Sequence, residues 1–191
     1  MGFKDYIFEE SLITPEMETH FQKRTNEHIA RVQKYAKKIE STYPQFKGLT
    51  EQASKHDASK LKEPERTPYV FISWQYKKKA DGEKYDIPKS INGNEATMHH
   101  IKNNSHHPEF HSADETKLDR ENRDKAHNCI DASKMPDMDV AEMCADWLGM
   151  SEEMGTSVVD WAHKVIDKRW AFSKNQKALI FKILDTVKVG K

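Results

Sequence analysis

The sequence predicts an all-α protein with a single domain. Apolar residues recur at intervals of three, four and seven positions through most of the chain, which is the period of an amphipathic helix. Charged residues make up 32% of the chain and the mean hydropathy is −0.91, so a lean core is expected under a charged surface. The 191 residues suffice for one substantial core, and they contain no internal repeat or recognisable linker.

The first long helix is predicted for residues 15–42. A Thr-Pro-Glu start signal precedes it, with proline at the first helical position and an acid in the first turn. Tyr43-Pro44 ends it. His28 lies within its apolar stripe, so the imidazole is expected to face the interior. The other members of that stripe are Phe21, Val32, Tyr35 and Ile39.

The next segments are shorter. A helix that begins at Thr50 is expected to carry His56 and Asp57 near its C-terminal end. Residues 69–76 have the side chains of a strand, but we interpret them as helix because their surroundings are helical. Residues 77–94 start with three lysines and read as an exposed connection.

Two different segments follow that connection. Residues 95–105 predict a helix, which stops before Pro108 because proline disfavours helical geometry in the residue that precedes it. Residues 111–128 are almost all polar or charged, so they predict a polar surface insertion or lid, or else a poorly anchored helix.

The C-terminal third predicts three helices. The first opens at Pro136-Asp137 and is interrupted at residues 151–155. A second covers about residues 158–166, and Ser173 caps a last helix that reaches Val187. Trp161 and Trp170 are expected in the core.

Composition excludes several classes of protein. Basic and acidic residues balance at 31 each, which is not the charge of a protein that neutralises many nucleic-acid phosphates. No apolar run approaches the roughly 20 residues of a membrane span, and no signal peptide is visible. Cys129 and Cys144 form no disulfide framework, which favours a reducing, cytoplasmic location. The oligomeric state is left open.

Three positions indicate a metal site. His56 and Asp57 are adjacent, and a neighbouring imidazole and carboxylate suit a divalent ion better than an apolar core. Asp146 precedes Trp147 at the edge of a predicted buried face, where a carboxylate needs a cation or several hydrogen bonds. Singly, each is better explained as a structural residue. Together with the inward-facing His28, they predict one site for a divalent ion.

Four short sequence motifs follow one another within residues 20–150: an early helical His, a His-Asp pair, further histidines and a late helical Asp. They are HIARV at 28–32, HDASK at 56–60, NSHHPE at 104–109 and EMCADW at 142–147. In this order and these motifs, the chain resembles the HD-domain superfamily of metal-dependent phosphohydrolases, and within it a family of uncharacterised phage and bacterial proteins. The resemblance implies an HD-like helical bundle with four ligands for its principal metal: His28, His56, Asp57 and Asp146.

The resemblance also implies ligands for a second ion between the His-Asp pair and the last Asp. His100 and His107 are the expected ligands, because they share one face if the helix continues through Asn104. His106 is the next choice, and His99 is expected on an exposed face. The alternative is a polar, histidine-rich helix end that binds no metal. The cofactor is thus one or two divalent ions, such as manganese, magnesium, iron or zinc.

Lys60 and Glu109 complete the candidate site. By the resemblance, Lys60 contacts a phosphate that is bound at the metal; the alternative is an ion pair with Glu63 or Glu65. Glu109 is expected to orient a ligand histidine or to act as a base.

These expectations favour a metal-dependent phosphohydrolase for a nucleotide or another phosphomonoester, with a metal-activated water as nucleophile. The chain has no phosphate-binding glycine loop, no Cys-x-x-Cys pair and no Gly-x-Ser-x-Gly elbow, which excludes P-loop kinases, zinc ribbons and serine hydrolases. One alternative is a di-iron oxygenase of the HD type. Another is a non-catalytic binding module that metal stabilises. The expected partner is a small phosphorylated molecule, and neither a membrane nor a nucleic acid is expected.

Overall fold

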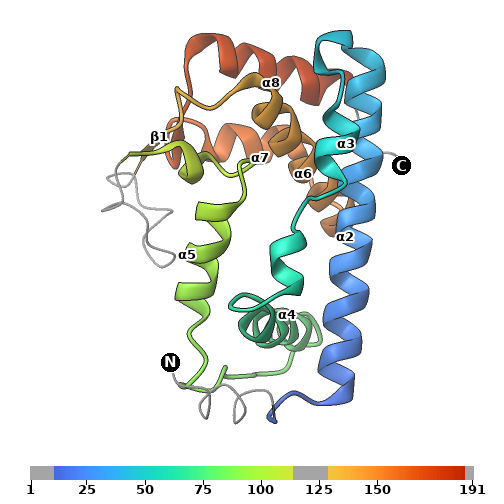
Figure 1. The fold of residues 1–191 in the computed structure, drawn as a ribbon, viewed down its shortest axis with the longest axis vertical. Helices are drawn as coiled ribbons and strands as arrows, with labels where there is room; N and C mark the ends of the chain where they lie inside the picture. The colour runs from blue at the N-terminus through green and yellow to red at the C-terminus, as the bar shows by residue number, and fades with distance from the viewer. Residues whose placement is uncertain (1–10, 114–128, 188–191) are drawn as a thin grey trace. The chain divides into compact units, whose positions relative to one another are not determined.

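The computed structural model describes residues 11–113 and 129–187, which confirms the all-α fold (Figure 1). Contacts within the chain divide it into two compact units. Unit 1 contains Met1–Glu27 and Asp57–His100, and unit 2 contains His28–His56 and Ile101–Lys191. The single domain stays a prediction. The predicted insertion or lid falls mainly on residues 114–128, which lie outside the described residues.

Unit 1 is built from the first part of α2 (Pro15–Thr42), the 3-10 helix η2 (Ala58–Leu61), α4 (Arg66–Ala80) and most of α5 (Gly93–Asn103). The predicted start of α2 is confirmed, because the Thr14 hydroxyl accepts a hydrogen bond from the Met17 N–H. A small apolar core holds the unit together: Met17, Phe21, Val70, Phe71, Trp74 and Ile91.

Helix α4 confirms the helical interpretation of residues 69–76 and corrects the end of that segment. The three lysines were expected in an exposed connection, but they form the last turn of the helix, which ends at Ala80. Lysines favour this position because they face the negative end of the helix dipole. An ion pair between Lys77 and Asp81, four residues apart, supports the same turn.

Unit 2 contains the rest of α2, α3 (Leu49–Ala53), α6 (Asp137–Met154), α7 (Val158–Val165) and α8 (Lys174–Thr186). Helix α6 packs against α3, α7 and α8 (Figure 1). Four short elements also belong to unit 2. They are the 3-10 helices η1 (Pro44–Phe46) and η3 (Pro108–His111) and the two-residue strands β1 (Ile130–Asp131) and β2 (Trp170–Ala171), which pair in parallel. The sequence analysis missed that strand pair.

The predicted interruption at residues 151–155 is wrong for most of its length. Helix α6 continues to Met154 and ends only at Gly155, whose positive φ of 62° is the left-handed cap that glycine adopts without strain. The capped start of α8 is confirmed: Ser173 and Gln176 form a reciprocal capping box.

Helix α5 ends at Asn103, two residues earlier than predicted. His100 is therefore helical, whereas His107 lies beyond the helix and precedes η3. The expectation that His100 and His107 share one helix face is wrong for this reason. Because Pro108 disfavours helical geometry in the preceding residue, the backbone of His107 is extended, with ψ 128°.

The chain around the His-Asp pair also differs from the prediction. Helix α3 ends at Ala53, so His56 lies in the turn that follows it. Asp57 has a positive φ of 56°, an uncommon conformation that aspartate tolerates better than most residues. The turn, rather than a helix end, therefore sets the directions of these two side chains.

Within unit 2, α2 and α6 approach closely at Gly149. A Cβ atom added to Gly149 would lie 3.4 Å from Cβ of Arg31 and 3.4 Å from a methyl group of Val32. This contact lies one turn from both His28 on α2 and Asp146 on α6, and it helps to bring those side chains together. No helix among the described residues is both long and apolar enough to cross a membrane.

Candidate metal centre

Three of the predicted ligands meet inside unit 2. Nε2 of His28 lies 3.2 Å from Oδ1 of Asp146 and 3.3 Å from Nε2 of His56. Nε2 of His56 lies 3.9 Å from the same Asp146 oxygen. Both imidazoles are buried, and the Asp146 side chain is 18% exposed. The three atoms therefore form a triangle of potential donors contributed by α2, the turn after α3, and α6.

The size of this triangle fits a bound ion. Nitrogen and oxygen ligands lie about 2.0–2.2 Å from zinc, so neighbouring ligand atoms of one ion are roughly 3–3.5 Å apart. Two of the three edges fall in that range, and the third is slightly longer. Two imidazole nitrogens also face each other at 3.3 Å, an arrangement that needs either a proton or a cation between them.

Glu142 fixes the orientation of His56. It lies one helical turn before Asp146 on α6, and its Oε1 is 3.0 Å from Nδ1 of His56. A proton on Nδ1 that is donated to Glu142 leaves the Nε2 lone pair directed at the triangle, which is the usual support for a metal-binding histidine. Gln52 donates a hydrogen bond to the other Glu142 oxygen, so both carboxylate oxygens are held.

Asp146 and Glu142 both have pKa values below their usual range. Burial alone would raise the pKa of Asp146, but the hydrogen bond from His28 and the charges of His28 and His56 outweigh it and hold this pKa far below its usual range. For Glu142, burial again opposes ionisation, and the hydrogen bond with His56 is the largest effect that lowers its pKa. Asp146 is therefore available to an ion as a carboxylate ligand.

Unit 1 contains a second histidine–carboxylate cluster. Nε2 of His100 lies 3.1 Å from Oδ1 of Asp57, and Nδ1 of the same ring lies 2.9 Å from Oε2 of Glu65. Ser59 donates to that glutamate, and Nδ1 of His99 lies 2.7 Å from its other oxygen. Glu65 is completely buried, and burial acts against these hydrogen bonds, which nevertheless lower its pKa. His100 is thus held between two carboxylates.

Lys60 belongs to this second cluster. Its ammonium group lies 2.5 Å from Oδ2 of Asp57 and also sits over the ring of Tyr69. Of its two predicted alternative partners, Glu63 accepts hydrogen bonds from Thr67, and Glu65 faces the histidines. The contact of Lys60 with a phosphate stays a prediction.

The three remaining candidates, His106, His107 and Glu109, lie in unit 2. The ring of His106 packs 4.1 Å from that of His56, and its Nδ1 is 3.7 Å from Glu142, so His56, His106 and Glu142 form a group that could hold an ion. The ring centroids of His107 and His106 lie 4.2 Å apart, with their planes tilted by 42°. Glu109 is buried, and its Oε1 lies 3.7 Å from the Arg169 guanidinium. Its roles as base or ligand support stay predictions.

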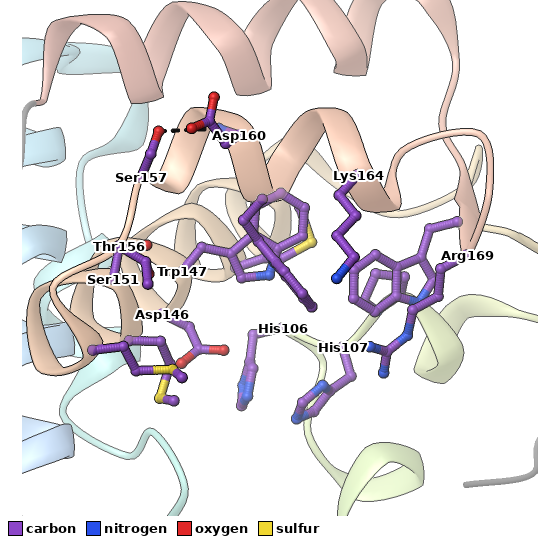
Figure 2. Close-up of a pocket in the computed structure, with 16 residues that line it drawn as sticks. His106, His107, Asp146, Trp147, Ser151, Thr156, Ser157, Asp160, Lys164 and Arg169 are labelled. Atoms are coloured by element: carbon purple, nitrogen blue, oxygen red, sulfur yellow. Dashed lines mark hydrogen bonds between the residues drawn. The ribbon is translucent and has the colours of Figure 1, made fainter. Parts of the chain in front are cut away.

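A cavity of about 680 Å³ adjoins the triangle within unit 2. Asp146, His106 and His107 line one part of it, and Figure 2 shows these side chains facing the same space as Lys164 and Arg169. Trp161 and Trp170 were expected in the core. Trp170 is buried, Trp161 is half-buried, and both line this cavity. The site therefore combines potential metal ligands, two cations and an aromatic wall.

The sequence analysis missed the two supporting glutamates. The role of Glu142 could have been predicted, because this residue precedes Asp146 by four positions and so lies on the same face of the helix. The role of Glu65 could not, since its partners His99 and His100 lie 34 and 35 residues away along the chain. The tryptophans of the cavity were read as core because burial and cavity lining have the same apolar pattern.

Comparison with known proteins yields one family. Residues 17–186 match the model of a family described as "Family of unknown function (DUF5662)". No curated protein and no solved structure matches the chain.

Proposed function

The chain belongs to the DUF5662 family, whose function is unknown, and we propose that it is a metal-dependent phosphohydrolase for a nucleotide or another phosphomonoester. The observation that carries the proposal is the buried triangle of His28, His56 and Asp146, with edges of 3.2 to 3.9 Å. The order of these residues in the sequence, which resembles that of the HD-domain superfamily, supports the same assignment.

The donor set favours some ions over others. Two imidazoles and one carboxylate suit zinc, iron or manganese, whereas magnesium prefers a set made of oxygen ligands alone. When bound, such an ion supplies positive charge to a phosphate and lowers the pKa of a bound water. The part that Asp57 plays, as the neighbour of His56 in the chain, stays a prediction from the resemblance.

The residues of this chain have distinct tasks in the proposed reaction. His28, His56 and Asp146 bind the ion, and Glu142 keeps the Nε2 lone pair of His56 directed at it. Lys164 and Arg169 line the adjoining cavity, where their charges attract a phosphate group and stabilise the negative charge that develops during its transfer.

Elemental analysis of the purified protein, followed by hydrolysis assays on phosphomonoesters with that metal restored after chelation, tests the proposal. His56→Ala is expected to lose both bound metal and hydrolysis. His163→Ala is the matched control, because His163 is an exposed histidine of the same unit that stacks on Phe181. Metal-dependent hydrolysis that survives intact in His56→Ala contradicts the proposal.

The cluster of unit 1 favours a second candidate, a di-iron oxygenase. His100 and Asp57 offer a further imidazole and carboxylate, and Glu65 supports that histidine. The metal distinguishes the candidates: iron with dioxygen consumption supports the oxygenase, and metal-dependent phosphate release supports the hydrolase. A fully metal-loaded protein that does neither would be a binding module.

A further inference from the structure

We infer that the cavity of unit 2 binds a planar aromatic ring that is part of the phosphorylated substrate. This inference rests on the proposed function for the phosphate and adds the group to which that phosphate is attached. It excludes small aliphatic phosphates as the preferred substrates. Three observations carry it: the composition of the wall, the position of a lysine, and the size of the cavity.

The wall of the cavity is flat and aromatic. The indole rings of Trp147 and Trp170 are stacked, with their centroids 5.7 Å apart and an angle of 21° between their planes. These two rings cover each other and are almost fully buried, so the half-buried Trp161 is the indole that offers a ring face to a bound molecule. Flat π-faces bind planar rings by stacking and give sugars or alkyl chains much less contact. Polarisable thioethers line the same space: Met143, Met150 and Met154.

Lys164 is the cation best placed for the phosphate. The charge of Arg169 is already balanced by Glu109 at 3.7 Å, and its guanidinium packs over Trp170. Lys164 extends toward the side of the cavity that His107 lines (Figure 2), and no described carboxylate forms an ion pair with it. A substrate phosphate between Lys164 and the His28–His56–Asp146 triangle would place the attached ring against the tryptophans.

The cavity has the volume of a small-molecule site. Its 680 Å³ lies within the roughly 300–1,000 Å³ of typical ligand pockets, far more than a phosphate alone requires. A second cavity of about 460 Å³ reaches His56, His106 and Glu142. Apart from Gly48, its other lining residues are polar: Glu51, Gln52, Lys55, Asn103, Asn104 and Ser105. Of these two cavities in unit 2, the first is thus the one that suits an aromatic ring.

Binding of three non-hydrolysable probes to the metal-loaded protein, measured by titration calorimetry, tests this inference. Methylphosphonate carries no ring, phenylphosphonate carries a simple ring, and the phosphonate analogue of adenosine monophosphate carries a nucleobase. Both ring-bearing probes are expected to bind about tenfold more tightly than methylphosphonate, or better. Which of the two binds more tightly distinguishes a nucleobase from another aryl group.

Two pairs of variants locate the binding. Trp161→Ala is expected to abolish the preference for ring-bearing probes, whereas Trp161→Phe retains it, and the melting temperature of each variant establishes that it is folded. Lys164→Gln is expected to weaken the binding of all three phosphonates about tenfold. Lys168→Gln removes an exposed lysine that does not line the cavity, and it is expected to leave all three affinities unchanged.

The outcomes separate this inference from the proposed function. Equal affinity for the three probes, or a ring preference that survives in Trp161→Ala, overturns the aromatic site while leaving phosphohydrolase activity possible. If adenosine or phenol binds in a Trp161-dependent manner but no phosphonate binds, the aromatic site stands and the phosphohydrolase fails. Binding of none of these molecules overturns the inference.

Discussion

The same arrangement of side chains occurs once in each unit. In unit 2, Glu142 holds Nδ1 of His56, whose Nε2 faces Asp146; in unit 1, Glu65 holds Nδ1 of His100, whose Nε2 faces Asp57. The glutamate-to-Nδ1 distances are nearly equal, at 3.0 and 2.9 Å. Both glutamates are buried and both have lowered pKa values. The two clusters differ in what neutralises the aspartate.

In unit 1, Asp57 has the ammonium group of Lys60 at 2.5 Å. In unit 2, the close partners of Asp146 are imidazoles, and the nitrogen of His28 contacts both Asp146 and His56. A lysine supplies a positive charge but no lone pair, whereas a neutral histidine supplies a lone pair but no charge. Unit 2 therefore offers three donors that need a cation, and unit 1 brings a cation of its own. We expect the most tightly bound ion in unit 2.

The largest effect is expected from removing the feature that distinguishes the clusters. His28→Ala reduces the donors of unit 2 to one histidine and one aspartate, as in unit 1. Metal affinity is expected to fall by more than about 100-fold, since loss of a ligand exceeds the roughly 10–100-fold cost of losing a residue that supports one. Competition with a chelator measures this change. Unchanged affinity in a folded His28→Ala protein would falsify the ligand assignment.

The two glutamates give the next comparison. Glu142→Gln keeps the size of the side chain but removes the charge that accepts the Nδ1 proton of His56. Metal affinity is expected to fall roughly 10–100-fold. Glu65→Gln makes the same change in unit 1 and is expected to leave the tightest ion in place. A larger loss of affinity in Glu65→Gln than in Glu142→Gln would place that ion in unit 1.

Lys60→Met tests the cation of unit 1. Asp57 is buried and would lose its ion-pair partner, so the free energy of unfolding is expected to fall by about 2 kcal/mol. This is less than the 3–5 kcal/mol of a fully buried pair, because the Lys60 side chain is 22% exposed. Urea unfolding measures the change. A variant as stable as the parent protein would show that Lys60 does not neutralise Asp57.

The smallest effect concerns Glu40, which orders the chain leading to His56. Hydrogen bonds from the Thr50 hydroxyl and from the N–H groups of Gly48 and Thr50 lower the pKa of Glu40. Its contribution to stability is therefore present above the unfolded pKa of about 4.3 and is lost as the pH falls through the lower folded pKa. Glu40→Gln is expected to be less stable than the parent protein at about pH 7, with a smaller difference at about pH 3.

Urea unfolding at both pH values measures the effect of Glu40. Glu51→Gln is the matched control, because Glu51 is an exposed glutamate on α3, the short helix whose first turn Glu40 contacts. A stability difference for Glu40→Gln that persists unchanged in acid would mean that its carboxylate charge is not what stabilises this segment.

The sequence by itself determined the helical fold and where several helices begin. The Thr-Pro-Glu start of α2 and the capping box of α8 are local signals, made by residues within four positions of one another, and the structure confirms both. Where several possible helix-end residues lie close together, the predicted boundary was wrong. The break predicted at residues 151–155 gave too much weight to Ser151, since only Gly155 adopts the conformation that ends α6.

Only the tertiary structure decided how the site is supported. The order of His28, His56 and Asp146 indicated a metal site. The sequence alone did not show that the Nε2 atoms of His28 and His56 lie 3.3 Å apart. Contacts such as that of Glu65 with His100 join residues far apart along the chain, and such pairs leave no periodic trace. The same holds for the tryptophans that line the cavity with Asp146. Residues of the core and residues of a cavity wall are both apolar, so only the packing determines which tryptophans line a cavity.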